Sequence, residues 1–516
     1  MRTFASLLVA GLIALFGAAS TLRADDKVIV HEWGTFTSLQ DENGQAIGGI
    51  NVDDEPVPGF VWQYANRTVA SQYSHDSYNF GLPPYNADGG KGWTNGDPNV
   101  TMRLETPVIY IYPPKGQSTQ SVPPLDVHVD FHGGVLSQYY PYAVTNGADL
   151  NGNTPYLANP GITGTMTTGL TWKNVKLGST LKPVETNDQV WTTPRETSAP
   201  LLEVHPMLTV YKDANGVMHD DAQAEHFLFY RGVGHLESSI RLIVDPHNSG
   251  EKDQFYIYPN LRKAVPLEIA LDAVYDQAWL TEIRADGSCA FRTCPQFGGL
   301  QEQTRMSHFA SVKSKFEPSD FTPENLTALK SSMHAALVKE GLYDDEATAM
   351  LKTWELSYFK SPGLRFFYIV PRAWVDKVLP LKITGAPTNI TRVMVGRIEL
   401  ISEAQKATLA RLAAGPCPDL AAVKAAATDA LEKAKLSESE KQSFYDGERP
   451  LSDLGIAIPP LVQDYLSLGR FRDALIVHEQ QQHPSAALAQ FIQDNSLGVE
   501  KTFQTIIAPA AQVKTP

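Results

Sequence analysis

The chain contains few of the features that usually identify a protein class. Its 516 residues include only three cysteines, so no dense disulfide framework holds the fold together. Beyond the N-terminal segment there is no apolar run of the roughly 20 residues that a membrane span needs. Rossmann and P-loop glycine patterns are absent, which disfavours a parallel nucleotide-binding sheet. The Gly-x-Ser-x-Gly nucleophile elbow is missing as well.

Positive charge is also scarce. The formal net charge is −14 at pH 7, and it becomes −16 if Arg2 and Arg23 are removed with an N-terminal segment. So acidic a surface does not suit nucleic acid, which proteins bind by neutralising phosphates, and it disfavours adhesion to anionic lipid. Hydrophobic residues make up 43% of the chain, enough for globular cores. The length indicates roughly two to four domains.

The first 24 residues have the pattern of a cleavable secretion signal. Arg2 provides a positive start, residues 4–19 are apolar, and Ala24 ends a stretch of small residues. The apolar run is shorter than a membrane-spanning helix requires, although an uncleaved N-terminal anchor is the alternative. No cysteine lies near Ala24, which disfavours a lipid-anchored lipoprotein. We therefore expect cleavage near Ala24 and a periplasmic or secreted mature chain without a membrane span.

The order of strand-like and helix-like segments predicts an α+β fold. Short runs of β-branched and aromatic residues, separated by Gly, Pro and Asn turns, favour an antiparallel sandwich or barrel in the first half. Helical periodicity begins after the cap Thr322, and later helices start at Asp419 and Ser437. We predict a large β-sandwich-like region, a smaller β segment packed on it, and a C-terminal helical domain. The expected boundaries are 1–24 for the signal peptide, 25–283 for the β-rich domain, 284–355 for a connector with two helices, 356–401 for the β segment, 402–500 for the helical domain and 501–516 for the tail.

Two of the cysteines are close enough in sequence to pair. Cys289 and Cys294 flank the short segment 290–293, which we interpret as a loop, and an oxidising compartment would permit a disulfide between them. So small a ring would stabilise the fold only weakly. Zinc binding would need further ligands at matching spacing, and none is nearby. Cys417 has no evident activating neighbour, so an inert thiol is favoured over a nucleophile.

The densest group of candidate metal ligands lies in the strand-like segment 126–132. Side chains alternate along a strand, so His128, Asp130 and His132 share one face. Two imidazoles and a carboxylate are suitable ligands for zinc, iron or manganese if a further ligand comes from elsewhere. The alternative interpretation is an amphipathic strand whose polar face is exposed to water.

Other histidines are weaker candidates. His31 and Glu32 are neighbours on a strand and point to opposite faces, so we favour a structural role with Trp33 in the core and Gly34 at a bulge. A second possible metal cluster combines His205, His226 and His235, if a glycine-rich bulge brings them together.

Aromatic residues are concentrated in the loop-like region 60–100, among Asn, Asp and Gly. Exposed aromatic rings with polar neighbours suit sugar or peptide binding, whereas buried ones would pack the loop onto the β-rich region. The candidate ligand-binding residues are Trp62, Tyr64, Tyr73, Tyr78 and Trp93.

Several segments resemble a family of exported bacterial proteins that carry an N-terminal His-Glu-Trp-Gly-Thr-Phe-Thr sequence. The matching segments are residues 30–38, 103–110, 227–232, 365–372 and 392–399. The resemblance extends over most of the mature chain and implies an exported, multidomain protein. It transfers no activity, so no catalytic residue is carried over.

Two functions are consistent with these patterns. The first is a non-catalytic exported protein that binds an envelope or extracellular component through its aromatic loops and helical tail. The second is a secreted hydrolase, in one version dependent on a divalent metal held by His128, Asp130 and His132. The absence of a catalytic signature favours the first, and the clustered polar face favours the second. No other cofactor is indicated.

Overall fold

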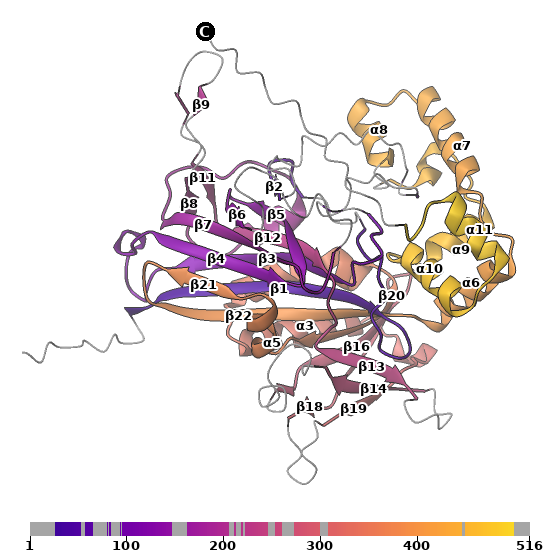
Figure 1. Ribbon diagram of the computed structural model, residues 1–516, viewed down its shortest axis with the longest axis horizontal. Coiled ribbons are helices and arrows are strands. Elements are labelled where there is room, and N and C mark those ends of the chain that lie inside the picture. Colours follow the sequence, from indigo (N-terminus) through magenta and orange to yellow (C-terminus); the bar gives the residue numbers. More distant parts are fainter. Residues whose placement is uncertain are drawn as a thin grey trace, which may run out of the picture.

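The fold is α+β, as the sequence predicts, and a nine-stranded sheet lies at its centre (Figure 1). The structure is a computed structural model that describes residues 26–499 apart from 53–56, 65–79, 81, 84–92, 94, 147–161, 206–210, 213–217, 220–221, 246–252, 261–272, 300–307 and 446–448. The strand order in the large sheet is β17-β16-β20-β22-β1-β3-β12-β5-β2. These strands are β1 (Val28–Gln40), β2 (Trp62–Gln63), β3 (Met102–Tyr112), β5 (Gly134–Tyr140), β12 (Leu228–Gly234), β16 (Ala278–Ile283), β17 (Cys289–Thr293), β20 (Gly363–Ile369) and β22 (Thr388–Leu400).

The two longest strands of this sheet come from opposite ends of the chain. β1 and β22 run parallel and pair from Val28↔Thr388 to Gln40↔Leu400, whereas the other neighbours in the sheet are antiparallel. The segment 356–401 therefore contributes β20 and β22 to the middle of the large sheet. Its third strand, β21 (Leu381–Thr384), pairs with a second sheet.

The second sheet packs on one face of the large sheet and makes a sandwich. Its path is β11-β8-β7-β4-β21, with β6 paired to β7. Alternate side chains of β4, including Val127 and Val129, meet Ile109 and Ile111 of β3 in the main hydrophobic core. The strands of this sheet are β4 (Leu125–His132), β6 (Val144–Asn146), β7 (Thr167–Leu177), β8 (Leu202–Val204) and β11 (Gln223–Glu225).

Helices bury the opposite face of the large sheet. α3 (Asn325–Lys339), α4 (Asp344–Thr353) and the π-helix η7 (Glu355–Lys360) pack on Trp33, Val108 and their neighbours in a second core. Because both faces are covered, β1 and β3 are buried along almost their whole length. Smaller elements surround this body: α1 (Gln189–Thr192), α5 (Arg372–Val378), β9 (Tyr211–Lys212), β10 (Met218–His219), β13 (Ile240–Val244), β14 (Gln254–Pro259), β15 (Val274–Tyr275), β18 (Phe297–Gly298) and β19 (Ala310–Lys313).

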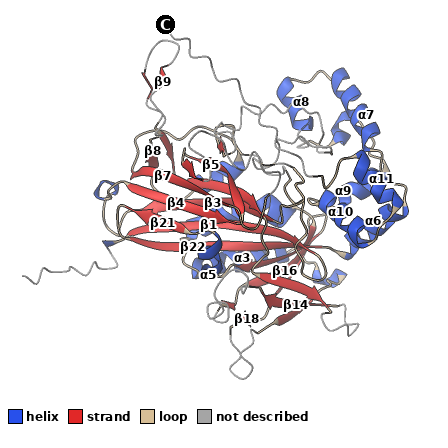
Figure 2. Cartoon of the chain, viewed as in Figure 1, coloured by secondary structure: helices blue, strands red, loops and turns tan. Residues whose placement is uncertain are grey.

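The C-terminal helices gather at one end of the sheets (Figure 2). The predicted caps are confirmed: Asp419 accepts a hydrogen bond from Ala422 N at 3.0 Å, and Ser437 forms a reciprocal box with Glu440. Among the described helices, none has the length and apolar character needed to cross a membrane. The helices are α6 (Glu403–Ala414), α7 (Leu420–Lys433), α8 (Glu438–Tyr445), α9 (Pro460–Ser467), α10 (Arg472–Gln482) and α11 (Ala486–Asp494).

The predicted Cys289–Cys294 disulfide is wrong, and both thiols are free and buried. The residues between them form the strand β17 rather than a loop. Five residues of extended chain span about 16 Å, whereas a disulfide joins Cα atoms less than about 7 Å apart. The odd spacing also sends the two side chains into different cores. Burial raises the pKa of Cys289 to about 11 and that of Cys294 to about 12.

Lys424 on α7 provides a pH-dependent test of the helical region. Its ammonium is half-buried and donates to Pro83 O, and burial lowers its pKa from 10.5 to about 8. Below pH 8 the group is charged in the folded and unfolded states, so folding carries the full cost of desolvating it. Between pH 8 and 10.5 the folded state releases the proton first, so this cost falls as the pH rises.

We therefore expect Lys424→Met to stabilise the protein at pH 7, with the gain shrinking between pH 8 and 10.5. Urea unfolding of the variant and the wild type at pH 7 and pH 10 measures the difference. Lys433→Met, at an exposed lysine of the same helix, is the control. A variant less stable than the wild type at pH 7 would contradict this account.

Candidate functional site

The predicted metal ligands on β4 do not converge. His128 Nδ1 lies 2.8 Å from Thr171 Oγ1 and its Nε2 lies 3.0 Å from Asp130 Oδ2, so both ring nitrogens are engaged. His132 Nδ1 instead bonds to Lys377 O at 2.8 Å. Within the described part of the chain, no three His, Cys, Asp or Glu residues are placed to hold a metal ion. The alternation of buried and half-buried residues along β4 fits the amphipathic strand.

The second histidine group is also dispersed. Each ring is held by a partner on a different part of the structure, so no common centre exists for a metal ion. The contacts are His205 Nε2 to Glu203 Oε1 at 2.7 Å, His226 Nδ1 to Ala199 O at 2.8 Å and His235 Nδ1 to Asn99 O at 2.8 Å.

The aromatic residues proposed for ligand binding are mostly in the core. Tyr64 and Trp93 are 2% and 5% exposed, and Trp62 is half-buried. Tyr73 and Tyr78 lie outside the described residues. Where the structure describes them, these rings pack the loop onto the sandwich, which was the alternative interpretation. The prediction that Tyr64 and Trp93 form an exposed ligand-binding face is therefore wrong.

A different part of the molecule shows an unusual arrangement, a row of bulges across four adjacent strands. The register shifts between β1 and β3 at Gly34, as expected for a bulge, and again between β3 and β12 and between β12 and β5. Thr106 of β3 has φ 45°, a left-handed conformation that is costly for a β-branched residue. At Gly34 a Cβ would lie 3.0 Å from Pro107 Cα. Bulges of this kind re-aim side chains and are frequent beside functional sites.

Just beyond the bulges, charged side chains cover the helix-packed face of the large sheet. Side chains of Arg103, Arg365 and Arg397 are at most 1% exposed. Cross-strand register brings them together, because Thr37 of β1 pairs with Arg103 on one side and Arg397 on the other. We call this set the arginine layer: Arg103 and Glu105 of β3, Arg231 of β12, Arg365 of β20, Arg397 and Glu399 of β22, and Arg470 from the turn between α9 and α10.

Ion pairs join members of the arginine layer in two groups, one around Glu105 and one around Glu399. Arg231 Nε instead donates to Gln138 Oε1. Glu105 Oε1 lies 3.0 Å from Arg103 Nε and 3.1 Å from Arg470 Nη2. Glu399 Oε1 lies 2.7 Å from Arg397 Nε and 3.4 Å from Arg365 Nε. Burial opposes ionisation of Glu399, but the surrounding guanidinium charges outweigh it and lower its pKa. Glu399 is therefore an anion within a group of buried cations.

Arg365 has mainly a structural role in the layer. Its Nη1 donates to Ser357 O at 2.8 Å and to Tyr358 O at 3.0 Å, and its Nη2 donates to Ser361 O and Pro362 O. These bonds satisfy carbonyls at the end of the π-helix, which would otherwise be buried without donors. Burial lowers the pKa of Arg365 to about 10. Arg365 thus fixes η7 against the sheet.

Arg397 differs because it has donors to spare. Its Nη1 makes no hydrogen bond within the described residues, whereas its Nη2 lies 2.5 Å from Glu399 Oε1. The guanidinium also lies 5.7 Å from the centroid of the Tyr358 ring. Hydroxyls of Thr37, Thr281 and Ser357, all buried around Arg365 and Arg397, also have no hydrogen-bond partner there. Buried polar groups in native proteins are nearly always satisfied, so this concentration of donors without partners marks a candidate binding site.

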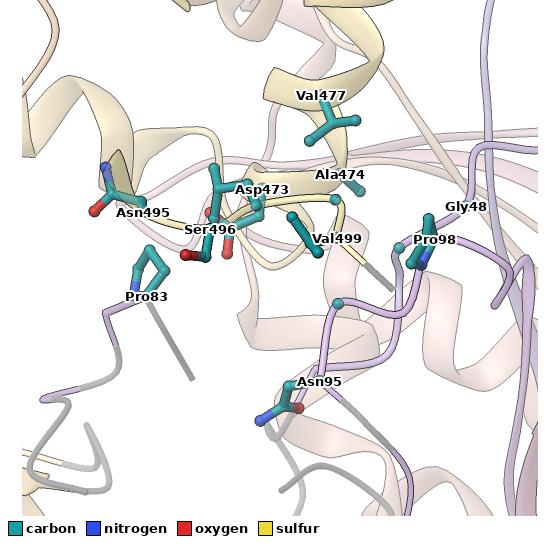
Figure 3. Close-up of a pocket in the computed structure, with 14 residues that line it drawn as sticks. Gly48, Pro83, Asn95, Pro98, Asp473, Ala474, Val477, Asn495, Ser496 and Val499 are labelled. Atoms are coloured by element: carbon teal, nitrogen blue, oxygen red, sulfur yellow. The ribbon is translucent and has the colours of Figure 1, made fainter. Parts of the chain in front are cut away.

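A narrow cleft lies beside the layer, between the helical region and loops of the β-rich body. Figure 3 shows Ala474 and Val477 of α10 on one side, with Gly48 and Pro98 nearby. Its volume of about 30 Å³ is space for about two water molecules. Only glycine fits at position 48, because a Cβ there would lie 1.9 Å from Pro98 O. The adjoining residue Ile50 accepts a hydrogen bond from Arg103, so this loop connects the cleft to the layer.

None of the residues of the arginine layer was predicted as a site residue from the sequence. A usable signal was present: four of the five segments that carry the family resemblance contain Arg103, Glu105, Arg231, Arg365, Arg397 and Glu399, and the fifth contains Thr37. The Arg-x-Glu alternation of β3 and β22 has the same period as a solvated strand face, so the pattern alone does not indicate a buried charged site.

Comparisons with known proteins add no assignment. No protein-family model and no curated protein matches the sequence. Among solved structures, the yeast delta-COP-I mu-homology domain complexed with a Dsl1 WxWxV peptide is 6% identical, with a TM-score of 0.22. That match covers 73% of this chain and 96% of the other. So low a TM-score carries no argument about fold or function.

Proposed function

We propose that this chain is an exported, non-catalytic binding protein that holds a small oxyanion, such as a phosphate, sulfate or carboxylate group, at the arginine layer. The export signal of residues 1–24 supports its location outside the cytoplasm. The proposal includes membership of the exported bacterial family that five segments resemble, since those segments supply the strands of the layer.

The spare donors of Arg397 are the observation that carries the proposal. A guanidinium offers a planar fork of N–H groups that matches the oxygens of a carboxylate or phosphate. The hydroxyls of Thr37, Thr281 and Ser357 can add further donors to the same oxygens.

The hydrolase is less well supported. Its metal version relied on His128, Asp130 and His132, but His128 bonds to Asp130 and Thr171, and His132 bonds to Lys377 O. The arginine layer itself presents cations and hydroxyls without a hydrogen-bonded base, so it suits binding better than nucleophilic attack.

Thermal unfolding of the mature chain with added oxyanions tests the proposal. At constant ionic strength, we expect phosphate, sulfate or acetate to raise the melting temperature and chloride to have no effect. A ligand at 100 times its Kd stabilises the folded state by about 2.7 kcal/mol, which is readily measured. Arg397→Met should abolish the shift, and Arg411→Met, at a half-exposed arginine paired with Asp464, should retain it.

A milder variant covers the case in which Arg397→Met does not fold. Thr37→Val removes one buried hydroxyl that has no partner and keeps the shape of the side chain. It should fold with nearly wild-type stability and bind the oxyanion up to about tenfold more weakly. The proposal fails if no oxyanion stabilises the wild type more than chloride does, or if the shift persists in both variants.

A further inference from the structure

The turn between α9 and α10 is the part of the helical region that reaches the arginine layer. We propose that this turn, residues 469–471, completes the oxyanion site and also closes it, so that the ligand enters only when the turn moves away from the sheet. This inference rests on the proposed function. It adds a second ligand-facing cation, Arg470, and a gate, Phe471.

The contacts of the turn place it directly on the layer. Arg470 Nη2 lies 3.1 Å from Glu105 Oε1, although the two residues are 365 positions apart in the chain. The Phe471 ring lies between two guanidiniums, with Arg103 at 5.6 Å and Arg470 at 5.4 Å from its centroid. Cation–π attraction therefore holds the ring over the charged face. Phe471 is 3% exposed, so its ring is buried against the layer.

The conformation of the turn depends on Gly469. This residue has φ 83°, in the left-handed region that glycine adopts without strain. It ends the α9 segment after Leu468, whose carbonyl accepts a hydrogen bond from Gln405 Nε2 at 2.8 Å. The chain can therefore reverse direction and present Arg470 and Phe471 to the sheet.

Among the described walls of the layer, the turn belongs to the helical region, whereas the others are the sheet and the π-helix packed on it. The sheet is continuous on one side, and Arg365 anchors the π-helix through four carbonyls. The turn meets the sheet through the Arg470–Glu105 ion pair and the Phe471 ring. On its other side the chain continues into Ala474, which lines the cleft next to Gly49.

The gate predicts a kinetic effect. A preformed open site binds small anions faster than the 10⁵–10⁷ M⁻¹s⁻¹ typical of protein association, whereas a site that must first open binds more slowly. Removing the Phe471 ring should leave the spare donors of Arg397 in place and make them more accessible. Removing the Arg470 charge should weaken the ligand complex itself.

Binding of inorganic phosphate to the full mature chain separates these roles. Stopped-flow tryptophan fluorescence gives the association rate, and titration gives the Kd. We expect Phe471→Ala to raise the association rate about tenfold or more, and Arg470→Met to raise the Kd about tenfold. Arg449→Met, at a surface arginine of the same region paired with Asp453, is the matched control and should change neither.

Hydrogen exchange of α10 provides a readout that does not need the ligand. Phe471→Ala should speed amide exchange in residues 472–482 without phosphate, and phosphate should slow it in the wild type. Wild-type binding with unchanged rate, Kd and exchange in both variants would overturn the inference and leave the proposed function intact. A wild type that binds neither phosphate nor any other tested oxyanion would overturn both.

Discussion

Glu32→Ala is expected to lower the free energy of unfolding by about 3–5 kcal/mol, the usual cost of removing one partner of a buried ion pair. Glu32 and the Arg392 side chain are fully buried between the two sheets, where the Arg392 Nε donates to Glu32 Oε2. Tyr230 OH donates to the other carboxylate oxygen at 2.5 Å. Loss of Glu32 leaves a desolvated guanidinium and a buried hydroxyl without their acceptor.

The electrostatics of the pair point the same way. Burial alone would lower the pKa of Arg392, but the Glu32 charge outweighs it and raises the pKa above its ordinary value. Burial, followed by the Glu32 charge, raises the pKa of Tyr230. Arg392 also reaches the half-exposed Asp376 at 2.9 Å, a contact that cannot replace a buried acceptor.

Urea unfolding monitored by circular dichroism measures the loss. Asp376→Ala is the matched control and should cost about 1 kcal/mol or less, because that pair is near the surface. The double variant Glu32→Ala, Arg392→Met should recover part of the loss, since no charge then remains buried alone. A single-variant loss below about 1 kcal/mol would show that the pair is dispensable.

Gly232→Ala is expected to destabilise the large sheet by about 3 kcal/mol or more, at the upper end of overpacking effects. A Cβ at this position would lie 2.1 Å from Val135 O, 3.0 Å from Val135 C and 3.2 Å from Leu136 Cα. These atoms are backbone of β5, so relief requires the strands to separate. Gly232 also lies in the row of bulges, where β12 changes register against β3.

Gly164→Ala is the control for this substitution. Gly164 lies in a turn, and its Cβ would meet no atom nearer than His235 O at 3.3 Å. We expect a change within about 0.5 kcal/mol there. Thermal unfolding of both variants checks the contrast, and the Gly232 variant should also give less soluble protein. Equal stability of the two would mean that β5 moves freely at this point.

The sequence was a good guide where local patterns decide the structure. The strand-like runs at 28–37, 125–131 and 364–370 are strands, and the caps Asp419 and Ser437 begin helices. Near Thr322 the agreement is poorer, because α3 begins at Asn325 after a turn. The hydrogen-bonding capacity of single side chains and the alternation of polarity are local properties, and they were sufficient here.

Local patterns failed where a distant segment covers a surface. Arg397 and Glu399 alternate with apolar residues as on a solvated strand, yet both are buried, and the Arg397 guanidinium lies over the Tyr358 ring of η7. His128 has the same pattern on β4, and there the polar face is partly open to water. Nothing within either strand distinguishes the two cases. The disulfide prediction for Cys289 and Cys294 failed because composition does not distinguish a strand from a loop over the four residues between them.

The parallel pairing of β1 with β22 has a consequence for how the chain is made. Paired residues such as Glu32 and Arg392 are 360 positions apart. At a synthesis rate of roughly 5–20 residues per second, β22 appears about 20–70 s after β1. Throughout that interval one edge of a long, apolar strand has no native neighbour, which is a recognised risk for misassembly. Productive folding therefore depends on keeping the early part of the chain unassociated until its last strand arrives, and folding should be slow for so non-local a topology.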